Sequence, residues 1–362
     1  MRILFLIGRL NRGGGTETHV LTLARGLRRL GHHVTIYTSG GPWVANAQRC
    51  GLVVVSQSSM MRLGQREVTG FAEFLKNHPF DIVHAHETVG FTIFHRARPL
   101  LKSKPPFVFT LHSPYIGPRT LRRVCETAQA VISVSAPFRK RLTRFGCVSP
   151  RKVSIIPNGV DMETFRPTLK ATARKTFGIT PQRFVIGYAA RFTTDKIGLG
   201  ERVSNSLKNY AMQNRNIQIL IAGRASRKHV RPASNVKVLG HLDKMEVFDN
   251  ACDVVIGTGR VAAETLACGT PSILIGHGGY HGLVTSRNIS RMIAHNFADH
   301  AEPPYNAWTK QQLYNLLSVI RRNIKLVNKD TERVRTMIHR RLSTGTMVQQ
   351  VVTVYKSIAP KR

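Results

Sequence analysis

The sequence predicts an α/β protein made of two consecutive doubly wound, parallel-sheet domains. Short continuous apolar runs alternate with amphipathic helical patterns along most of the chain. Such runs are typical of parallel strands that are buried on both faces. The alternation starts again after a proline- and glycine-rich stretch at residues 156–159, which we take as the link between the domains. A chain of 362 residues, 42% of them hydrophobic, is long enough for two such cores.

The first unit is expected to run strand, glycine loop, helix, strand. Residues 3–7 are a continuous apolar run, and glycines follow at 13–15. A helical pattern at 16–30 ends at Gly31, and a strand pattern follows at 33–37. This order is that of a βαβ unit in a parallel sheet.

Ten further strands and a long helical segment complete the expected fold. In the first domain the strands are expected at residues 52–55, 82–83, 107–111, 130–134 and 153–156. In the second they are expected at residues 184–188, 217–222, 236–239, 253–256 and 272–275. Residues 308–355 are helical in pattern. The expected domains are residues 1–166 and 167–340, and a helical segment at 341–362 is expected to pack back on the first domain.

The chain is strongly basic. It has 54 Lys and Arg against 19 Asp and Glu, a formal net charge of +35. Residues 1–168 carry 24 basic and 8 acidic side chains (+16), and residues 169–362 carry 30 and 11 (+19). Both halves will therefore attract polyanions: nucleic acid, an anionic membrane face or phosphorylated substrates. A nucleic-acid-binding protein is the least favoured class, because the sequence contains no recognisable binding module for DNA or RNA.

Cysteine spacing gives no sign of a metal or redox site. The five cysteines lie far apart and form no CxxC pair. Their odd number suits a reducing compartment. The apolar run at residues 3–7 is too short for a signal peptide, and no stretch reaches membrane-spanning length. We therefore expect a cytoplasmic protein that uses no metal or other cofactor.

The glycine loop after the first strand is a candidate anion site. Gly14 and Gly15 could let backbone N–H groups approach an anion at a helix N-terminus, and a plain tight turn is the alternative. The loop is not GxGxxG, and Thr38 and Ser39, rather than an acidic residue, close the second strand. A dinucleotide site normally uses an acidic residue there for the ribose hydroxyls. The sequence therefore disfavours a dehydrogenase.

Arg191 and Lys196 follow the strand expected at 184–188. In an open parallel sheet, ligands bind beyond the carboxyl ends of the strands. An Arg and a Lys in such a loop suit two phosphate groups, the Arg as a planar fork and the Lys as a point charge. The chain has no Asp-x-Asp pair for a divalent metal, so these cations would themselves neutralise a diphosphate leaving group. Two solvated surface charges are the alternative.

A second loop follows the strand expected at 253–256 and consists of Gly257, Thr258, Gly259 and Arg260. Glu264 lies in the early turns of the next helix. A carboxylate there is suited to accept hydrogen bonds from ribose hydroxyls. A glutamate that merely stabilises the helix N-terminus is the alternative.

Together these motifs resemble the retaining, GT-B-fold glycosyltransferases of family 4, and the resemblance covers nearly the whole chain. The matching segments are Gly-Gly-Thr-Glu at 14–17, Gly-His-His-Val at 31–34, Asp-Ile-Val-His-Ala-His at 81–86, Thr-Leu-His at 110–112, Ile-Pro-Asn-Gly-Val-Asp at 156–161, Phe-Arg-Pro at 165–167, Arg-x4-Lys at 191–196 and Glu-Thr-Leu-Ala-Cys-Gly-Thr-Pro at 264–271. Each motif alone is weak, whereas their order and spacing together are specific.

The resemblance implies two Rossmann-like domains that face a cleft, with the acceptor in the N-terminal domain and a nucleotide-sugar, by default a UDP-sugar, in the C-terminal domain. It implies that Arg191 and Lys196 clamp the diphosphate, that Glu264 holds the ribose, and that transfer needs no metal. His112 would contact the transferred sugar and count with Arg191 and Lys196 as catalytic, whereas His84 is expected to be structural. The implied donor loop is Gly257, Thr258, Gly259 and Arg260, and the implied acceptor loop is Gly14, Gly15 and Glu17.

Position 256 departs from the family pattern. The family usually carries two glutamates with seven residues between them, and counting back from Glu264 reaches Ile256. The missing carboxylate is the one that, in the family, touches the donor sugar or supports its ring. An active enzyme is the favoured interpretation, because Arg191, Lys196 and His112 remain. A non-catalytic GT-B subunit that binds a partner is the alternative.

A basic amphipathic segment suggests where the acceptor lies. Phe138, Leu142 and Phe145 share one helical face, flanked by basic residues. Such segments lie on anionic membranes. We therefore expect peripheral attachment to the inner face of the cytoplasmic membrane and a glycan, glycolipid or lipid-linked acceptor in cell-surface glycoconjugate synthesis. A core-packed basic helix is the alternative, and the oligomeric state is left open.

Overall fold

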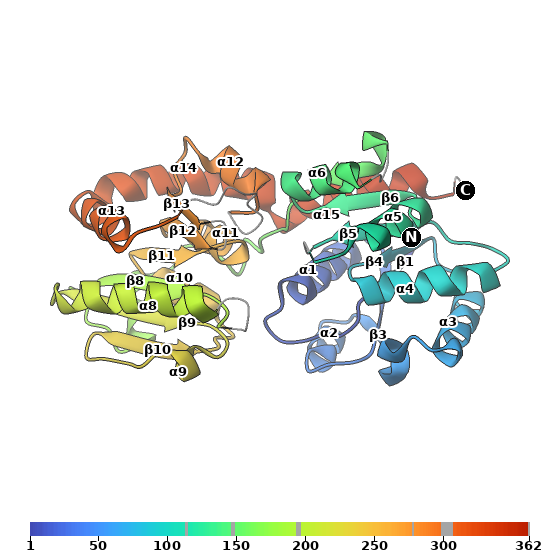
Figure 1. Ribbon diagram of the computed structural model, residues 1–362, viewed down its shortest axis with the longest axis horizontal. Helices are drawn as coiled ribbons and strands as arrows, with labels where there is room; N and C mark the ends of the chain where they lie inside the picture. The colour runs from blue at the N-terminus through green and yellow to red at the C-terminus, as the bar shows by residue number, and fades with distance from the viewer. Residues whose placement is uncertain (113–114, 146–148, 193–196, 277–278, 298–306, 361–362) are drawn as a thin grey trace. The chain divides into compact units, whose positions relative to one another are not determined.

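The computed structural model describes residues 1–112, 115–145, 149–192, 197–276, 279–297 and 307–360. The chain divides into two compact units, each built around its own sheet (Figure 1). The N-terminal unit comprises Met1–Gly159 and Thr344–Arg362, and the C-terminal unit comprises Val160–Ser343. The domain boundaries expected from the sequence, 166/167 and 340/341, lie within seven residues of the boundaries between these two units.

Among the described residues, the N-terminal unit has a seven-stranded sheet in the order β3-β2-β1-β4-β5-β6-β7, parallel throughout. Its strands are β1 (Arg2–Leu6), β2 (His33–Thr38), β3 (Val53–Ser56), β4 (Ile82–Ala85), β5 (Phe107–Leu111), β6 (Ala130–Ser133) and β7 (Val153–Ile155). The central strands β4, β5 and β6 are buried along their whole length, as their continuous apolar sequences predict.

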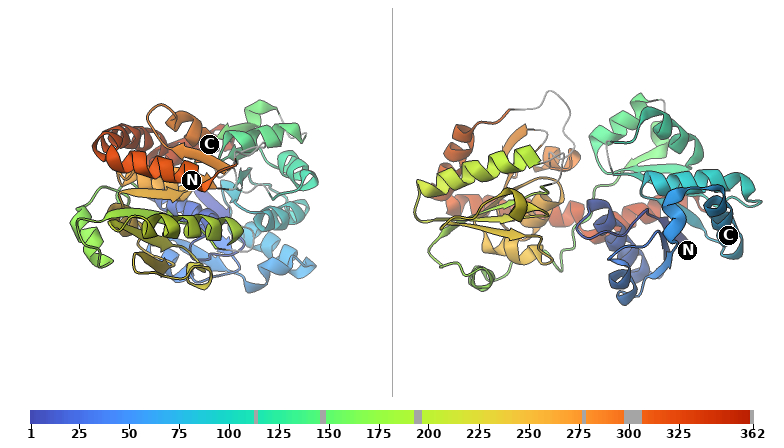
Figure 2. Two further views of the ribbon diagram at one scale, coloured as in Figure 1. Left: turned by 60° about the vertical axis from the view of Figure 1, so that its left-hand side comes forward. Right: turned by 60° about the horizontal axis from the view of Figure 1, so that its bottom comes forward.

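Helices cover both faces of this sheet (Figures 1 and 2). They are α1 (Gly15–Arg29), α2 (Val44–Arg49), α3 (Gln65–Asn77), α4 (Thr88–Ala97), α5 (Pro118–Thr127), α6 (Ala136–Arg144) and α15 (Thr344–Ile358), with 3₁₀ turns η1 (Ser58–Arg62), η2 (Arg98–Leu100) and η3 (Pro150–Lys152). Because side chains alternate along a strand, Leu4 and Leu6 of β1 join the core under α3 to α6, whereas Ile3 and Phe5 join the core under α1 and α15.

The C-terminal helix α15 returns to the N-terminal unit, where it packs on α1 (Figure 2). A Cβ at Gly26 of α1 would lie 2.4 Å from Cγ2 of Val348, so the glycine permits the close approach of the two helices. Tyr355 of α15 is fully buried, and its hydroxyl lies 2.6 Å from Nδ1 of His84 in β4. The last helix is therefore part of the N-terminal core.

The C-terminal unit has, in the part of the chain that is described, a six-stranded sheet in the order β10-β9-β8-β11-β12-β13. Its strands are β8 (Phe184–Ala189), β9 (Ile217–Ala222), β10 (Val236–Gly240), β11 (Val254–Gly257), β12 (Ser272–Gly276) and β13 (Gly279–Leu283). The five strands that the sequence predicted are parallel, and the structure adds β13 at the edge, which runs antiparallel to β12. β13 was missed because its sequence has no apolar run, and Gly279 and Gly282 both have positive φ.

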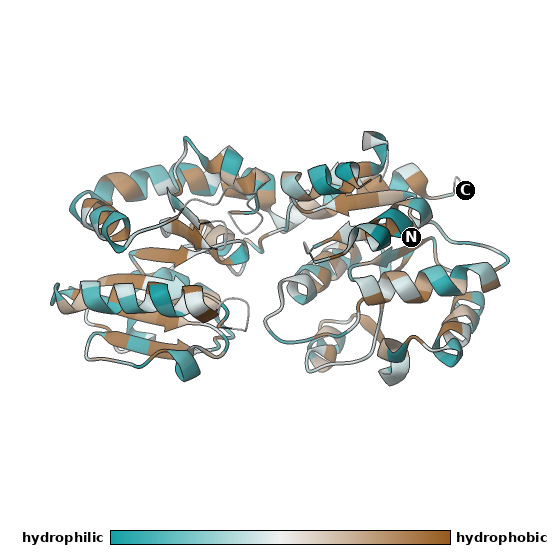
Figure 3. Ribbon diagram, viewed as in Figure 1, coloured by the Kyte–Doolittle hydropathy of each residue, from teal (hydrophilic) through white to brown (hydrophobic). Residues whose placement is uncertain are grey.

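The helices of the C-terminal unit are α7 (Lys170–Thr176), α8 (Ile197–Met212), α9 (Ser226–His229), α10 (Met245–Ala251), α11 (Arg260–Ala267), α12 (Ile289–Ala294), α13 (Lys310–Arg322) and α14 (Ile324–Leu342). α8 and α13 share one core with the sheet, and α7, α10, α11, α12 and α14 form the cores of its other face. The segment expected to be helical at 308–355 is three helices, separated at Asn323 and Ser343. The strands of both units are predominantly apolar, and the helices carry mixed surfaces (Figure 3).

Helix α6 does not present its apolar face to solvent. Phe138 and Leu142 are 4% and 0% exposed in the core of the N-terminal unit, and Phe145 packs partly buried against that core. The apolar face covers the sheet, so the expectation that it lies on a membrane is wrong and the core-packed alternative holds. No helix within the described residues is long and apolar enough to cross a membrane.

The cysteines do not all remain free. Cys50, Cys252 and Cys268 are free thiols. Cys125 of α5 is disulfide-bonded, and Cys147 lies outside the described residues. A disulfide at Cys125 is not what a reducing compartment favours.

Candidate functional site

Two segments that the sequence singled out meet at one edge of the C-terminal sheet. From β8 the chain builds outward through β9 and β10, and it then builds in the opposite direction from β11. β8 and β11 are neighbours, with Tyr188 opposite Ile256. Ligands of open α/β sheets bind beyond the carboxyl ends of the strands at such a switch point. Arg191 follows β8, and the loop that ends in Arg260 follows β11.

Glycines allow the β11 loop to lie close to the end of β8. A Cβ at Gly257 would lie 2.5 Å from Cγ1 of Val261 and 3.4 Å from the carbonyl oxygen of Ala189. Gly259 has φ +58° and ψ −127°, a conformation that L side chains rarely adopt. Its N–H donates to the carbonyl of Phe297 at 3.2 Å. The start of α11 is therefore fixed against the carboxyl end of β8, and half-buried Thr258 lies between the two glycines.

Arg191 is exposed at this edge. Within the described ranges it makes no ion pair or hydrogen bond, so its guanidinium is free to bind an anion. The next residue, Phe192, is 1% exposed and donates its N–H to the carbonyl of Arg224 at 3.1 Å, which anchors the loop. Lys196, the second predicted diphosphate ligand, lies outside the described residues.

Glu264 and Arg260 form an ion pair on α11, in which Nη2 of Arg260 donates to Oε1 of Glu264. Glu264 is 8% exposed. Burial raises the pKa of its carboxyl, and the charge and hydrogen bond of Arg260 oppose that rise. The sequence assigned Arg260 to the donor, with a plain helix-start arginine as the alternative. The structure places it against the carboxylate that was expected to hold the ribose.

A buried acid under α11 was not predicted. Asp249 of α10 is 1% exposed, and its Oδ1 accepts a hydrogen bond from Oγ1 of Thr265 at 2.7 Å. Its backbone carbonyl accepts from Thr270 at 2.8 Å, just past the end of α11. Burial raises the pKa of Asp249 well above its usual range, and the Thr265 hydrogen bond only partly offsets this. Asp249 thus contacts α11 at Thr265, next to Glu264, and the chain just past the end of this helix at Thr270.

Position 256 offers no substitute for the missing carboxylate. Ile256 lies inside β11, is 0% exposed and joins the core shared by β8, β11 and β12. Position 256 is therefore an apolar residue inside the strand, where the resemblance leads one to expect an acid.

The glycine loop of the N-terminal unit lies before α1, near the switch point between β1 and β4. A Cβ at Gly14 would lie 1.8 Å from Oε2 of Glu17, so the Glu17 carboxylate lies over this glycine. Gly15 has no atom within 4 Å of the position a Cβ would take. Gly15 is therefore the open part of the predicted acceptor loop, whereas Gly14 is covered.

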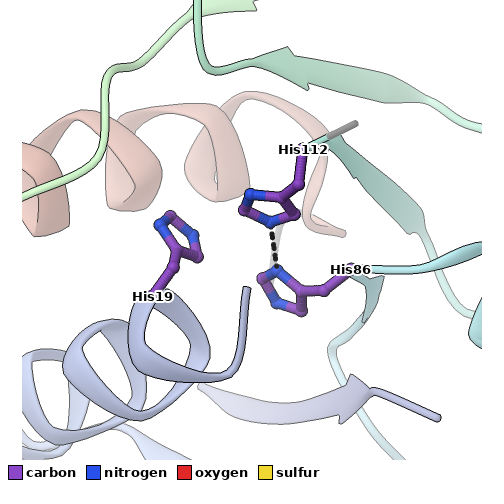
Figure 4. A group of neighbouring side chains, drawn as sticks. All are labelled: His19, His86 and His112. Carbon is purple, nitrogen blue, oxygen red and sulfur yellow. Dashed lines mark hydrogen bonds between the residues drawn. The ribbon is translucent and has the colours of Figure 1, made fainter. Parts of the chain in front are cut away.

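His112 does not stand alone. It follows β5, and its Nε2 lies 3.3 Å from Nδ1 of His86, which follows β4 (Figure 4). The ring of His19, from α1, lies 4.6 Å from that of His112 and 5.5 Å from that of His86. Burial lowers the pKa of His86 well below its usual range, and the neighbouring histidines lower it further. Sequence reasoning selected His112 alone. His19 and His86 were missed, although His86 lies within the motif at 81–86 and His19 lies two residues after the motif at 14–17.

His84 behaves differently from these three. Its Nδ1 pairs with the Tyr355 hydroxyl at 2.6 Å and its Nε2 with the Thr110 hydroxyl at 2.7 Å. Burial lowers the pKa of His84 well below its usual range. Both ring nitrogens are used inside the core, so His84 is a structural residue.

Comparison with known proteins agrees with these features. Residues 13–164 match the model of Glycosyltransferase Family 4. A phosphatidyl-myo-inositol mannosyltransferase from Propionibacterium freudenreichii subsp. shermanii is 26% identical over 292 residues, which cover 72% of this chain and 73% of the relative. The chain is thus similar to the glycosyltransferases of family 4. It is therefore an enzyme of the glycosyltransferase class.

Solved structures establish the fold of this glycosyltransferase. A glycosyltransferase from Rickettsia africae superposes with a TM-score of 0.78 at 18% identity, covering 99% of this chain and 98% of that one. Anabaena HepE in complex with UDP-glucose superposes with a TM-score of 0.75 at 18% identity, covering 99% and 100%. The glycosyltransferase has the GT-B fold, with two Rossmann-like units.

Proposed function

We propose that this glycosyltransferase transfers a sugar from a UDP-sugar to a lipid-linked acceptor with a phosphorylated head group, with retention of anomeric configuration. The observation that carries the proposal is the edge of the C-terminal sheet where exposed, unpaired Arg191 follows β8 and buried Glu264 lies one turn into α11. A guanidinium and a carboxylate on adjacent loops match the two polar ends of a nucleoside diphosphate.

In this proposal the donor spans the switch point. Arg191 and Lys196 bind the diphosphate, and Glu264 accepts hydrogen bonds from the ribose hydroxyls. The backbone of Gly257 and Gly259 allows the donor to approach the start of α11. UDP is the expected nucleotide because a structural neighbour, HepE, was solved with UDP-glucose.

The proposed reaction is a direct transfer in which the acceptor oxygen attacks the anomeric carbon on the face that the diphosphate leaves. The new glycosidic C–O bond forms as the bond to the phosphate oxygen breaks, and the acceptor hydroxyl proton passes to that departing oxygen. The cations of Arg191 and Lys196 stabilise the charge that develops on the leaving group. His112 contacts the transferred sugar. Catalysis therefore consists mainly of positioning and electrostatics.

The proposed acceptor rests on the net charge of the chain and on the name of a similar protein. The relative named above is a phosphatidyl-myo-inositol mannosyltransferase, whose acceptor is a phospholipid by name. The net charge of +35 favours phosphorylated and anionic partners. Because the apolar face of α6 is buried, attachment to a membrane would be electrostatic. Exposed basic residues on α5 that would contribute are Arg119, Arg122 and Arg123.

Buried Ile256 favours a second candidate, a GT-B subunit that binds a nucleotide-sugar without transferring it. The two candidates differ in turnover and agree in binding. A screen of nucleotide-sugars by isothermal titration identifies the donor, and incubation with that donor and phospholipid acceptors then tests transfer. We expect a lipid product whose anomeric configuration, measured by NMR, is that of the donor.

Variants of matched chemistry sharpen this test. Glu264→Ala is expected to weaken donor binding, and Glu73→Ala, at an exposed glutamate of α3, is expected to leave it unchanged. Binding without any transfer or hydrolysis would favour the binding subunit. An inverted product would overturn the proposed stereochemistry.

A further inference from the structure

The three histidines around His112 come from separate elements and converge on one point (Figure 4). His19 lies on α1, His86 follows β4 and His112 follows β5. One potential ligand nitrogen from each ring lies within 4.8 Å of the other two. His19 and His86 are 2% and 1% exposed, and His112 is half-buried. The cluster is therefore held inside the N-terminal unit with one ring reaching toward the surface.

The nitrogen pair of His86 and His112 has the dimension of a metal-ligand edge. Zinc–nitrogen bonds of ~2.0–2.1 Å in a tetrahedron place two ligand nitrogens ~3.3–3.4 Å apart. Nδ1 of His86 and Nε2 of His112 are 3.3 Å apart. The same spacing suits an N–H···N hydrogen bond between neutral rings. The two rings alone therefore do not indicate a metal site, and it is the third ring, that of His19, that points to one. His19 also offers a ring nitrogen within 4.8 Å of these ligand atoms, so the group can supply three imidazole ligands.

Comparison with His84 shows that this arrangement is not ordinary core packing. His84 uses both ring nitrogens on hydroxyl partners. His86 stacks beside it, with ring centroids 4.1 Å apart, yet Nε2 of His86 is buried with no hydrogen-bond partner among the described residues. The other contacts of His86 are to rings: His112, His19 and the edge of Phe5.

The backbone at each of the three histidines is held by regular secondary structure, which favours a preformed metal site. His86 and His112 leave adjacent, fully buried parallel strands, so their backbones are fixed by the sheet. His19 lies just over one turn from the N-terminus of α1, whose start is fixed by hydrogen bonds from Thr18 to the carbonyl of Gly14. Sites built on strands and helices hold their ligands more precisely than sites built on loops.

We propose that His19, His86 and His112 bind one divalent transition-metal ion, of the zinc class, through three imidazole nitrogens. Imidazole suits zinc, cobalt, nickel and copper, whereas magnesium and calcium take oxygen ligands. Three protein ligands leave one position for water or for an oxygen of a bound ligand. The three histidines belong to the N-terminal unit, whereas the donor diphosphate is proposed to bind Arg191 and Lys196 of the C-terminal unit. The metal site goes beyond the proposed transfer reaction and does not depend on it.

The test measures metal binding directly. Tag-free, full-length protein is stripped with a chelator and dialysed against Zn²⁺, and bound metal is measured by mass spectrometry. Co²⁺ is then titrated and followed by its visible absorption, which reports tetrahedral coordination. We expect one ion per chain and visible bands of a tetrahedral centre. We expect affinity to fall by about 100-fold or more in His19→Gln and in His112→Gln.

The chain has 15 histidines, so adventitious binding needs a matched control. His33→Gln changes an exposed histidine of the same unit and is expected to leave the stoichiometry and affinity unchanged. If His19→Gln does not fold, His112→Gln at the half-buried strand end carries the comparison. An anomalous difference map of the wild-type crystal soaked in Zn²⁺ locates the ion without any variant.

Three outcomes would overturn the proposal. They are the absence of bound metal in the wild type, equal affinity in the wild type and the His112→Gln variant, and an anomalous peak at other histidines. The first outcome would leave a hydrogen-bonded group of neutral rings. Because no donor or acceptor is present, these results are independent of whether the protein transfers sugar.

Discussion

Arg260 and Glu264 form an ion pair across one turn of α11, at the point where the donor ribose is expected to bind. Both side chains are largely buried, with 18% and 10% of their surfaces exposed. The pair joins Arg260 to the carboxylate that is proposed to hold the ribose. Burial raises the pKa of the Glu264 carboxyl, and Arg260 opposes that rise.

Removing Arg260 should shift the acidic side of the pH profile of kcat/KM to higher pH. In Arg260→Ala the pKa of Glu264 loses the influence that holds it down and rises further, so the carboxylate is protonated at a higher pH. We expect the fall in kcat/KM for the donor on acidification to begin at higher pH than in the wild type. Arg260→Lys keeps a cation and is expected to shift it less. An unchanged profile in Arg260→Ala would mean that Glu264 does not bind donor in its ionised form.

Asp249 should tolerate amidation better than truncation. Asp249→Asn keeps an acceptor for the Thr265 hydroxyl, whereas Asp249→Ala leaves that hydroxyl unpaired in the core, a loss of about 1–3 kcal/mol. The free energy of unfolding of the C-terminal unit can be followed through Trp308, in a Trp43→Phe background. Equal losses in the two variants would contradict the assigned hydrogen bond.

The same acid predicts a pH dependence of stability. Its pKa is raised in the folded state, so the folded protein binds the extra proton and stability falls as pH rises from the ordinary Asp value toward the folded pKa. Asp249→Asn removes this dependence. We therefore expect the stability of the C-terminal unit, relative to that of Asp249→Asn, to decrease as the pH rises above the ordinary pKa of an aspartate. A constant difference as the pH rises would show that Asp249 is ionised in the core.

Gly14 and Gly15 should respond differently to a methyl group. At Gly14 a Cβ would displace the Glu17 carboxylate, whereas at Gly15 it meets no atom within 4 Å. Gly15→Ala is expected to keep or raise stability, because alanine favours helix, and to raise KM for the acceptor with little change in donor binding. Gly14→Ala is expected to perturb Glu17 and lower stability. An unchanged acceptor KM in Gly15→Ala would remove this loop from the acceptor site.

Tyr355 should link α15 to the N-terminal core. Tyr355→Phe leaves Nδ1 of His84 buried and unpaired, and we expect a loss of about 1–3 kcal/mol. Thr353→Ala, on the exposed side of the same helix, is expected to stay within about 0.5 kcal/mol of the wild type. Unfolding of this unit can be followed through Trp43 in a Trp308→Phe background. Equal stability of the two variants would show that the hydrogen bond contributes nothing.

Strands with continuous apolar sequence were predictable, since residues 107–111 and 217–222 match β5 and β9 residue for residue. β13 was not, because a glycine-rich edge strand has neither an apolar run nor an alternating pattern. The amphipathic pattern of α6 was read correctly as a helix and wrongly as a membrane surface. Sequence shows that a helix has an apolar face, but only the tertiary fold shows what that face covers.

Site residues that lie in one short segment of the sequence could be predicted. Site residues that only the fold brings together could not. The β11 loop and Glu264 lie in one short segment and were found together. His19 and His86 join His112 only because β4 and β5 are neighbours and α1 begins beside them. Asp249 gave no sequence signal, because its role depends on burial beneath Thr265. The sequence did not predict that Arg260 pairs with Glu264, and only the structure shows this ion pair.

The most direct test of the central claim is the steady-state rate of sugar transfer by the wild type and by Glu264→Ala, with the identified UDP-sugar and a phospholipid acceptor. The account predicts transfer by the wild type and a loss of about 10- to 100-fold or more in kcat/KM for the donor in the variant, expressed mainly as weaker donor binding. Equal kcat/KM in both proteins, or no transfer by a wild type that binds the donor, would contradict it.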